Sequence, residues 1–455
     1  MKRGKRARAA RQGGFEEVRP NVAGVDLGSR EQWVCGPRVN GQRAVRSFRA
    51  TTAQLHELVR WLQAQDVKSV AMESTSVYWI PLYELLEANG IEVVLVNGRH
   101  VSRVPGRKSD VKDCEWLQQL HSCGLLQGSF RPDEAICRLR ALARERATLG
   151  AERTRIVQRM QKALDQMNVH VHHAVSDLTG KTGLGIVRAI VAGERDPSTL
   201  AALRDRRCQK SEAAIAEHLT GTWREEHVFN LRMGLRRYDE IMQVIAEYDA
   251  QLRSWIAKMA PAERLEHRVL AHPNADKEKG MRRRGEQDTR EALWRWAGVD
   301  LTRIDGLGVT AAEIVLTEIG LDLSAFPDEH HFVSWLRLTP NTATSAGKPV
   351  RRRNGTGATR VAGVLRMAAC TLAHSSSALG AYYRRLARRK SGAVAIFATA
   401  RKLAQLIFRM LRYGQDYVDE GATAYEARFH KQRLHQLTQT AEQFGYKLVP
   451  VLEAA

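Results

Sequence analysis

The 455-residue sequence has no long apolar run, few aromatic residues and fewer acids than bases. A membrane-spanning helix needs about 18 or more consecutive apolar residues, and an export signal needs a shorter apolar stretch behind a basic start. The sequence contains neither pattern. We therefore expect a protein that is neither inserted into a membrane nor exported.

Cysteine is scarce and irregularly spaced. The six cysteines form no CxxC pair, and their spacing suits neither a zinc module nor a disulfide framework, so we expect reduced thiols in a cytoplasmic protein. Two histidine groups, His170 with His172 and His173 and the pair His330 and His331, lack cysteines or carboxylates at matching spacing. We predict no zinc site at either group.

The shortage of acids leaves a large positive charge. There are 71 lysines and arginines against 50 acids, a formal net charge of +21. Such a surface attracts polyanions, and nucleic acid is the best candidate once a membrane is set aside. Several basic runs support this interpretation over a solvated surface that contacts nothing specific. They are a predicted disordered basic arm at 1–20, Arg282–Arg284, Arg351–Arg353 and Arg384–Lys390.

Residues 21–130 alternate short apolar runs with amphipathic stretches. The predicted order is three strands, a helix, a strand, a helix, a strand and a helix, with a turn at Asn40-Gly41 between the second and third strands. This is the order of a ribonuclease-H-like fold, in which helices pack on a mixed sheet. We expect an α/β domain here and helical regions after it.

Two long amphipathic patterns fill residues 131–260. One covers about 132–165, and the other carries apolar residues at helical spacing from Val228 to Ile256. They predict coiled-coil-like helices that pair within one chain or between chains, with an ordinary helical bundle as the alternative. Because the second stripe looks too long to be buried in one small domain, we predict that this region holds an oligomer together.

The remaining sequence divides into three parts. Residues 261–300 are highly charged and are predicted to be a linker or a surface insertion. Residues 301–420 predict a helical domain, and 421–455 a helical tail. The domain opens with Gly306 and Gly308 before an apolar helix, a pattern typical of a helix-hairpin-helix whose amides can hold a phosphate. A simple tight turn is the alternative.

Four acids stand at positions where catalytic carboxylates would meet. Asp26 ends the first strand, Glu73 ends the fourth, and Asp110 and Asp113 share one face of a helix that Ser109 can cap. The first and fourth strands are neighbours in a ribonuclease-H-like sheet. Clustered carboxylates repel one another unless cations neutralise them, so we predict a site for Mg²⁺, with Lys108 beside it as a nucleic-acid contact.

A Gly-rich basic loop between helices of the C-terminal domain holds Ser345. Its small neighbours would let a phosphodiester approach closely, and nearby cations could neutralise the phosphate. These cations are Lys348, Arg351, Arg352 and Arg353. Serine is a poor nucleophile unless a base or a metal activates it. The residues alone favour a loop that binds the DNA backbone without covalent chemistry.

The motifs together resemble a known family. GVDLGS around Asp26, AMESTSVYW around Glu73 and GRKSDVKDCEWL around Asp110 and Asp113 are similar to the four acids of the DEDD transposases. RIDGLGVTAAEIVLTEIG and FVSWLRLTPNTATSAGK are similar to the C-terminal domain of the same proteins, the insertion-sequence-110 transposases. The sequence departs from the family pattern at Asp305, where a proline is usual, at Ala346-Gly347, and in its longer charged stretch at 261–300.

The resemblance implies a RuvC-like domain with Asp26, Glu73, Asp110 and Asp113 as ligands of Mg²⁺, for which Mn²⁺ can substitute. It implies that Ser345 forms a covalent link to a DNA 5′-phosphate, within a composite site built from two subunits. It also implies a structured bridge RNA, donor and target DNA, a tetramer formed as a dimer of dimers, and a cytoplasmic, nucleoid-associated protein.

Our sequence-based hypothesis is therefore an RNA-guided DNA recombinase that moves a mobile element. One alternative is a RuvC-like nuclease that uses water as the nucleophile. Another is a nucleic-acid-binding scaffold without catalysis, which the intact set of four acids disfavours.

Overall fold

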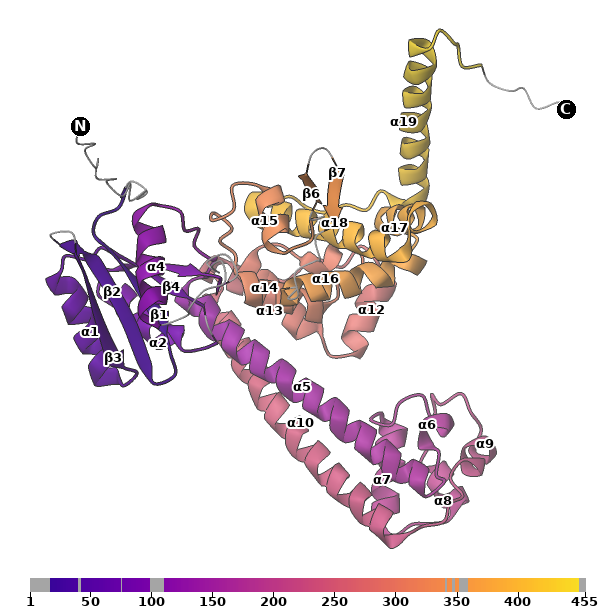
Figure 1. The fold of residues 1–455 in the computed structure, drawn as a ribbon. Coiled ribbons are helices and arrows are strands. Elements are labelled where there is room, and N and C mark those ends of the chain that lie inside the picture. Colours follow the sequence, from indigo (N-terminus) through magenta and orange to yellow (C-terminus); the bar gives the residue numbers. More distant parts are fainter. Residues whose placement is uncertain are drawn as a thin grey trace, which may run out of the picture. The chain divides into compact units, whose positions relative to one another are not determined.

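A computed structural model describes residues 17–39, 42–74, 76–98, 110–339, 342–345, 348–351 and 359–449. The chain divides into two compact units, Met1–Arg131 and Pro132–Ala455 (Figure 1). Among the described helices, none is both long and apolar enough to cross a membrane. The predicted turn at Asn40-Gly41 and most of the predicted basic arm at 1–20 lie outside the described residues.

The first unit is a five-stranded mixed sheet with helices on it, as predicted (Figure 1). The strand order is β3-β2-β1-β4-β5, with β1 antiparallel to β2 and parallel to β4. This is the ribonuclease-H-like arrangement. The elements are β1 (Val22–Leu27), β2 (Glu31–Val39), β3 (Gln42–Arg49), α1 (Thr52–Ala64), β4 (Ser69–Glu73), α2 (Trp79–Ala88), β5 (Glu92–Val96) and α4 (Asp110–Ser122).

The two faces of this sheet have different partners. Val25 and Met72 belong to a core that also contains Leu58 of α1 and Leu82 of α2. Strand residues alternate between faces, so their neighbours Gly24 and Ala71 belong to the other face. That face is covered by α4, which packs on β1.

The second unit contains a pair of long antiparallel helices, α5 (Glu134–Gln166) and α10 (Glu225–Met259). Towards one end of the helix pair, Arg146 of α5 donates a hydrogen bond of 2.8 Å to Asp249 of α10. Towards the opposite end, Gly234 of α10 lies against Met160 of α5. The apolar stripe of α10 is buried within this one chain. The length of the stripe therefore gives no physical reason to expect pairing between chains, and that part of the sequence argument is wrong.

Four short helices connect α5 to α10, and we call them the cap (Figure 1). They pack with the adjoining ends of α5 and α10 around one apolar core. The cap consists of α6 (Val171–Ala174), α7 (Lys181–Ala192), α8 (Pro197–Ala202) and α9 (Glu212–Glu217).

The rest of the second unit is mostly helical. Its elements are α11 (Ala262–Leu265), α12 (Ala275–Arg283), α13 (Gln287–Ala297), the 3₁₀ turn η1 (Leu301–Arg303), α14 (Val309–Ile319), α15 (Glu329–Trp335), β6 (Thr342–Ser345), β7 (Lys348–Arg351), α16 (Arg360–Thr371), the 3₁₀ turn η2 (Leu372–His374), α17 (Ala378–Arg389), α18 (Gly392–Tyr413) and α19 (Gly421–Gln443). The tail helix α19 buries none of its residues.

Two predictions for this region need correction. Residues 261–300 were predicted to be a linker or a surface insertion, and the linker alternative is wrong, because α13 packs on α10 and α14 and buries Leu293 and Trp296. The many charges in this segment hid the amphipathic pattern of a short helix. The basic loop around Ser345 also contains a hairpin, in which β6 pairs with β7.

Candidate active site

Asp26 and Glu73 lie side by side at the ends of two parallel strands. Val25 of β1 is in register with Met72 of β4, so Asp26 and Glu73 stand one residue further along each strand. Neighbouring strands are about 4.8 Å apart, and residues in register point to the same face. Because Val25 and Met72 face the core, the two acids face the side that α4 covers.

Contacts along α4 fix its direction across this face. The imidazole of His121 lies 2.9 Å from the Ser69 hydroxyl, at the start of β4. Gln118 donates to the carbonyl of Val22, at the start of β1. One turn earlier, Cys114 lies against Gly24, where a Cβ would come within 2.4 Å of the Cys114 carbonyl oxygen. The helix therefore runs antiparallel to β1, with its first turn towards the strand ends.

Asp110 and Asp113 occupy that first turn. The sheet-facing positions of α4 are Cys114, Leu117, Gln118 and His121. Helical periodicity places Asp110 one turn before Cys114 and Asp113 one turn before Leu117, on the same stripe. Burial, with Asp26 among the contributing charges, raises the pKa of the Cys114 thiol to about 12. The fold thus brings all four acids to one edge of the sheet.

Gly98 supports this edge, and the sequence analysis did not single it out. A Cβ at Gly98 would lie 2.1 Å from a carboxylate oxygen of Glu73. Glycine is thus the residue that leaves room for this carboxylate next to β5. A glycine shortly after the fifth strand is visible in the sequence. The reason for a glycine there is not, because it depends on the Glu73 side chain, which comes from β4.

Four carboxylates from two strands and a helix are a hard-oxygen donor set, which suits Mg²⁺ and leaves positions for phosphate oxygens. Among the described residues, one group of three or more potential metal ligands has its donor atoms within 4.8 Å of one another. That group consists of histidines of the second unit and includes none of the four acids. No three of the four acids therefore have carboxylate oxygens this close together, and they do not form a closed ligand shell. Rotation of their flexible side chains would have to bring them onto an ion.

Ser345 is the last residue of β6 in the β6–β7 hairpin. Its backbone is in register with Lys348, and Arg351 is in register with Thr342 at the open end. This strand pairing brings the backbone of Ser345 beside that of Lys348, the first lysine of the basic segment. The structure does not describe the side chains of these hairpin residues. The predicted nucleic-acid contacts Lys108, Arg352 and Arg353 and the predicted helix cap Ser109 also lie outside the described residues.

Gly306 and Gly308 precede α14 as predicted, but they serve different purposes. Gly306 has φ +86°, and a Cβ there would lie 2.9 Å from the Ala368 carbonyl oxygen of α16. Gly308 is the residue before the first turn of α14 and has open space around it. Gly306 therefore allows α16 to pack closely, whereas Gly308 leaves the N-terminus of α14 accessible. Asp305, beside them, has its pKa raised by burial.

Comparison with known families gives two matches. A family model described as transposase, for the DEDD domain of the IS110 group, matches residues 23–169. A model described as transposase IS116/IS110/IS902 family matches residues 299–384. The two matches stand in the expected order and together span about half of the chain. The chain belongs to the IS110 family of transposases.

The first match contains all four acids of this transposase, and the second contains Ser345 and the two glycines before α14, Gly306 and Gly308. The transposase is therefore a DNA-processing enzyme of the recombination type whose substrates are DNA. Residues 170–298, between the two matches, include the cap and α10 to α13. Among curated proteins, no significant match is found.

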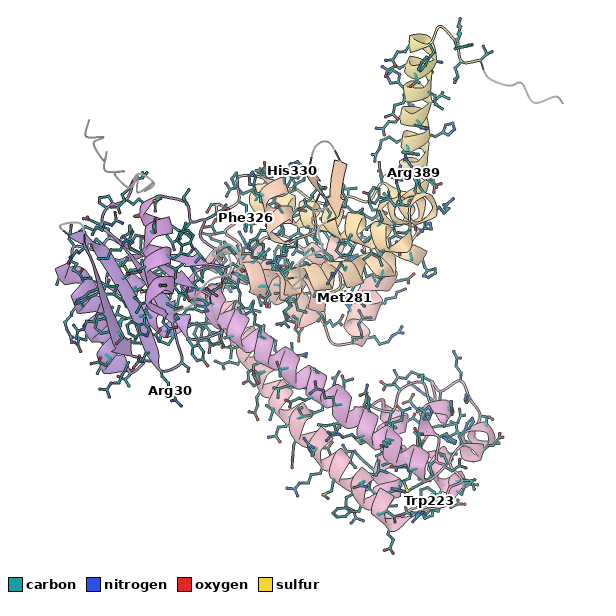
Figure 2. All side chains as sticks on the ribbon, in the orientation of Figure 1. Arg30, Trp223, Met281, Phe326, His330 and Arg389 are labelled. Carbon is teal, nitrogen blue, oxygen red and sulfur yellow. The ribbon has the colours of Figure 1, made fainter. Side chains whose placement is uncertain are left out.

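Part of the basic character of the transposase is structural. In the run Arg384–Lys390, the Arg384 guanidinium donates to the carbonyl of Ala373, and Arg385 stacks over Phe429 at 3.7 Å. These two arginines hold α17 against η2 and α19. Arg389, labelled in Figure 2, is exposed. Only the second half of this run is therefore available for a polyanion.

Proposed function

We propose that this transposase cuts and rejoins DNA through a covalent serine–5′-phosphate intermediate. Asp26, Glu73, Asp110 and Asp113 hold Mg²⁺, and Ser345 is the nucleophile. The observation that carries the proposal is the position of Asp26 and Glu73, each one residue beyond the in-register pair of Val25 and Met72, on the face that α4 covers. The family matches, which contain all five residues, support it.

The chemistry is an exchange of one phosphoester for another. The Oγ atom of Ser345 attacks the phosphorus as its proton passes to a carboxylate or to water. The bond between phosphorus and the 3′ oxygen breaks, and that oxygen leaves as a hydroxyl after taking up a proton. Bound Mg²⁺ would polarise the phosphate and lower the pKa of the attacking hydroxyl. A second 3′ hydroxyl can reverse the step, because no ester bond is lost.

Nucleic-acid binding in the proposal has two supports. The chain carries a net charge of +21, which favours polyanions. A groove of about 440 Å³ between α5 and α10 is lined by Arg159, Lys162 and Arg237, among other residues. Three cations along one groove suit a phosphate backbone.

We extend the proposal to a structured guide RNA and to a tetramer built as a dimer of dimers. Family resemblance is the support for both. The apolar stripe of α10 is buried within its own chain, so it contributes no argument for the tetramer.

The test replaces Asp26 with asparagine, which keeps the shape of the side chain and removes one negative charge. Strand cleavage with Mg²⁺ should fall by at least about a hundredfold, while DNA binding should persist. Asp66→Asn is the matched control, because Asp66 is an exposed acid in the same unit. It should leave both readouts unchanged, and full cleavage by Asp26→Asn would overturn the metal-binding role.

Two other functions remain outcomes of this test. If cleavage occurs without a covalent protein–DNA product, water is the nucleophile and the chain is a RuvC-like nuclease. If the wild-type chain binds DNA but never cleaves it, the chain is a scaffold.

A further inference from the structure

Three histidines gather in the cap of the second unit, in the sequence between the two family matches. Each of His170, His172 and His173 offers one ring nitrogen, and these nitrogens lie within 4.8 Å of one another. The rings of His172 and His173 are 4.1 Å apart between centroids, and the ring of His218 is 5.9 Å from that of His173. The sequence predicted no metal site here, because no cysteine or carboxylate stands at matching spacing.

Two of these ring nitrogens are buried without a hydrogen bond. Among the described residues, the Nδ1 atoms of His170 and His172 have no hydrogen-bond partner and are shielded from solvent. A buried imidazole nitrogen normally has a hydrogen-bond partner, because leaving it unpaired keeps the cost of removing it from water without any compensation. A bound cation would satisfy both nitrogens at once.

The environment of His170 also selects the form that binds a metal. Its Nε2 atom lies 3.1 Å from the amide oxygen of Asn168. An amide oxygen only accepts, so Nε2 carries the hydrogen and Nδ1 keeps a free lone pair. Metal-binding histidines in proteins almost always have this second hydrogen bond. Asn168 has φ +58°, a left-handed conformation that asparagine tolerates.

A carboxylate faces the two unpaired nitrogens. Asp165 Oδ1 lies 3.6 Å from His170 Nδ1 and 3.4 Å from His172 Nδ1. Ligands at about 2.0–2.1 Å around a tetrahedral zinc ion are about 3.4 Å from one another. The separations therefore match those of two ligand pairs around one ion. These two contacts with Asp165 are not hydrogen bonds, because neither Nδ1 atom has a hydrogen-bond partner.

The backbone under this group is well packed. Val169 and Val171, on either side of His170, are fully buried in the cap core. The His170 amide donates to the His218 carbonyl at 2.8 Å. Ligands held on such a framework lose little freedom when an ion binds. One cation opposes binding, since the Lys210 ammonium donates to the His173 carbonyl oxygen.

We propose that the cap of this transposase binds one Zn²⁺-like cation through His170, His172, His173 and Asp165. Three imidazoles suit a borderline-soft ion. Asp165, whose Oδ1 faces the Nδ1 atoms of His170 and His172, would complete four tetrahedral positions after a rotation of its side chain, the closed pattern of a structural site. The ion would join the end of α5 to α6 and fix the start of the cap. The site is independent of the four acids, whose oxygen donors favour Mg²⁺.

The test titrates zinc into the full-length chain after chelator dialysis, against a chromophoric competitor. Wild type should bind one tightly held zinc per chain. His170→Ala combined with His172→Ala should weaken the affinity at least a hundredfold. The matched control is His330→Ala with His331→Ala, since both histidines are exposed residues of α15; His330 is labelled in Figure 2. This control and Asp26→Asn should both keep the zinc.

Two gentler variants keep the proposal falsifiable if the double variant unfolds. Asn168→Gly retains the left-handed backbone but removes the amide oxygen, and should weaken zinc binding by about tenfold or more. Asp165→Asn removes the carboxylate charge and should also weaken it. X-ray absorption at the zinc edge should show three imidazoles. A wild-type chain without stoichiometric zinc, or unchanged affinity in the double histidine variant, would overturn the proposal.

Discussion

At the scale of single residues, Gly98 is the position where a small change should have a large effect on activity. Gly98→Ala places a methyl group 2.1 Å from a Glu73 carboxylate oxygen, and the carboxylate must move. A displacement of about 1 Å in a catalytic group can cost about a hundredfold in rate. We expect Mg²⁺-dependent cleavage to fall by that order, with little loss of DNA binding, as measured on labelled DNA.

Gly128→Ala is the control for this change. A Cβ there would meet only a Val94 methyl group, at an ordinary 3.7 Å. Equal cleavage by the Gly98 and Gly128 variants would show that Gly98 does not position Glu73.

His121 should make the first unit sensitive to acid. Burial lowers the pKa of this imidazole from 6.5 to about 4. Between those values the unfolded chain binds a proton that the folded chain does not, so the free energy of unfolding falls as the pH drops from about 6.5 to about 4. The loss should be on the order of 3 kcal/mol. In urea titrations across this range, His121→Gln should show a correspondingly smaller pH dependence, and an unchanged slope would contradict the account.

The sequence predicted the acids but not the residues that frame them. Asp26 and Glu73 were recognisable because each ends an apolar run, and strand order decides which ends are neighbours. Gly24 and Gly98 were not, because the need for glycine depends on a helix or side chain from elsewhere in the chain. The histidines of the cap were dismissed for want of a matching carboxylate, although Asp165 precedes them at the end of α5.

At the scale of elements, alternation and helical periodicity predicted the sheet and the long helices well. The weaker predictions concern segments in which tertiary contacts outweigh composition. The β6–β7 hairpin lies in a stretch of glycines and arginines with no strand-like alternation. In α13, three buried residues sit among charged neighbours, and one of the three is itself Arg290.

The buried ion pair between Arg290 and Asp300 tests whether 261–300 is an integral part of the fold. The Arg290 guanidinium donates to Asp300 at 2.7 Å and to the Leu270 carbonyl at 2.9 Å. Removing one partner of a buried pair costs about 3–5 kcal/mol. Asp300→Ala should lower the free energy of unfolding of the second unit by that order in chemical denaturation.

The same segment provides the control. Asp276 makes a long, exposed contact of 3.6 Å with Lys279, and exposed pairs contribute little. Asp276→Ala should leave the denaturation midpoint unchanged. If both variants behave alike, the segment is not integrated with its neighbours as the structure describes.

At the scale of the whole molecule, the two proposed sets of reactive residues belong to different units. The four acids belong to the first unit and Ser345 to the second, and each lies within its own family match. Neither set is sufficient for the proposed reaction. The serine has no histidine base among its sequence neighbours, and the acids alone support only hydrolysis by water. A covalent intermediate therefore distinguishes a recombinase from a nuclease.

The most direct measurement is a search for that intermediate. Wild type, Ser345→Ala and the control Ser334→Ala, an exposed serine of α15, are each mixed with labelled DNA, guide RNA and Mg²⁺, then denatured. We predict a denaturation-resistant protein–DNA band for wild type and the control, and none for Ser345→Ala, with nucleic-acid binding retained by all three. A band that persists in Ser345→Ala would assign the nucleophile elsewhere, with Thr344 the first candidate. Cleavage by wild type without any such band would contradict the covalent mechanism.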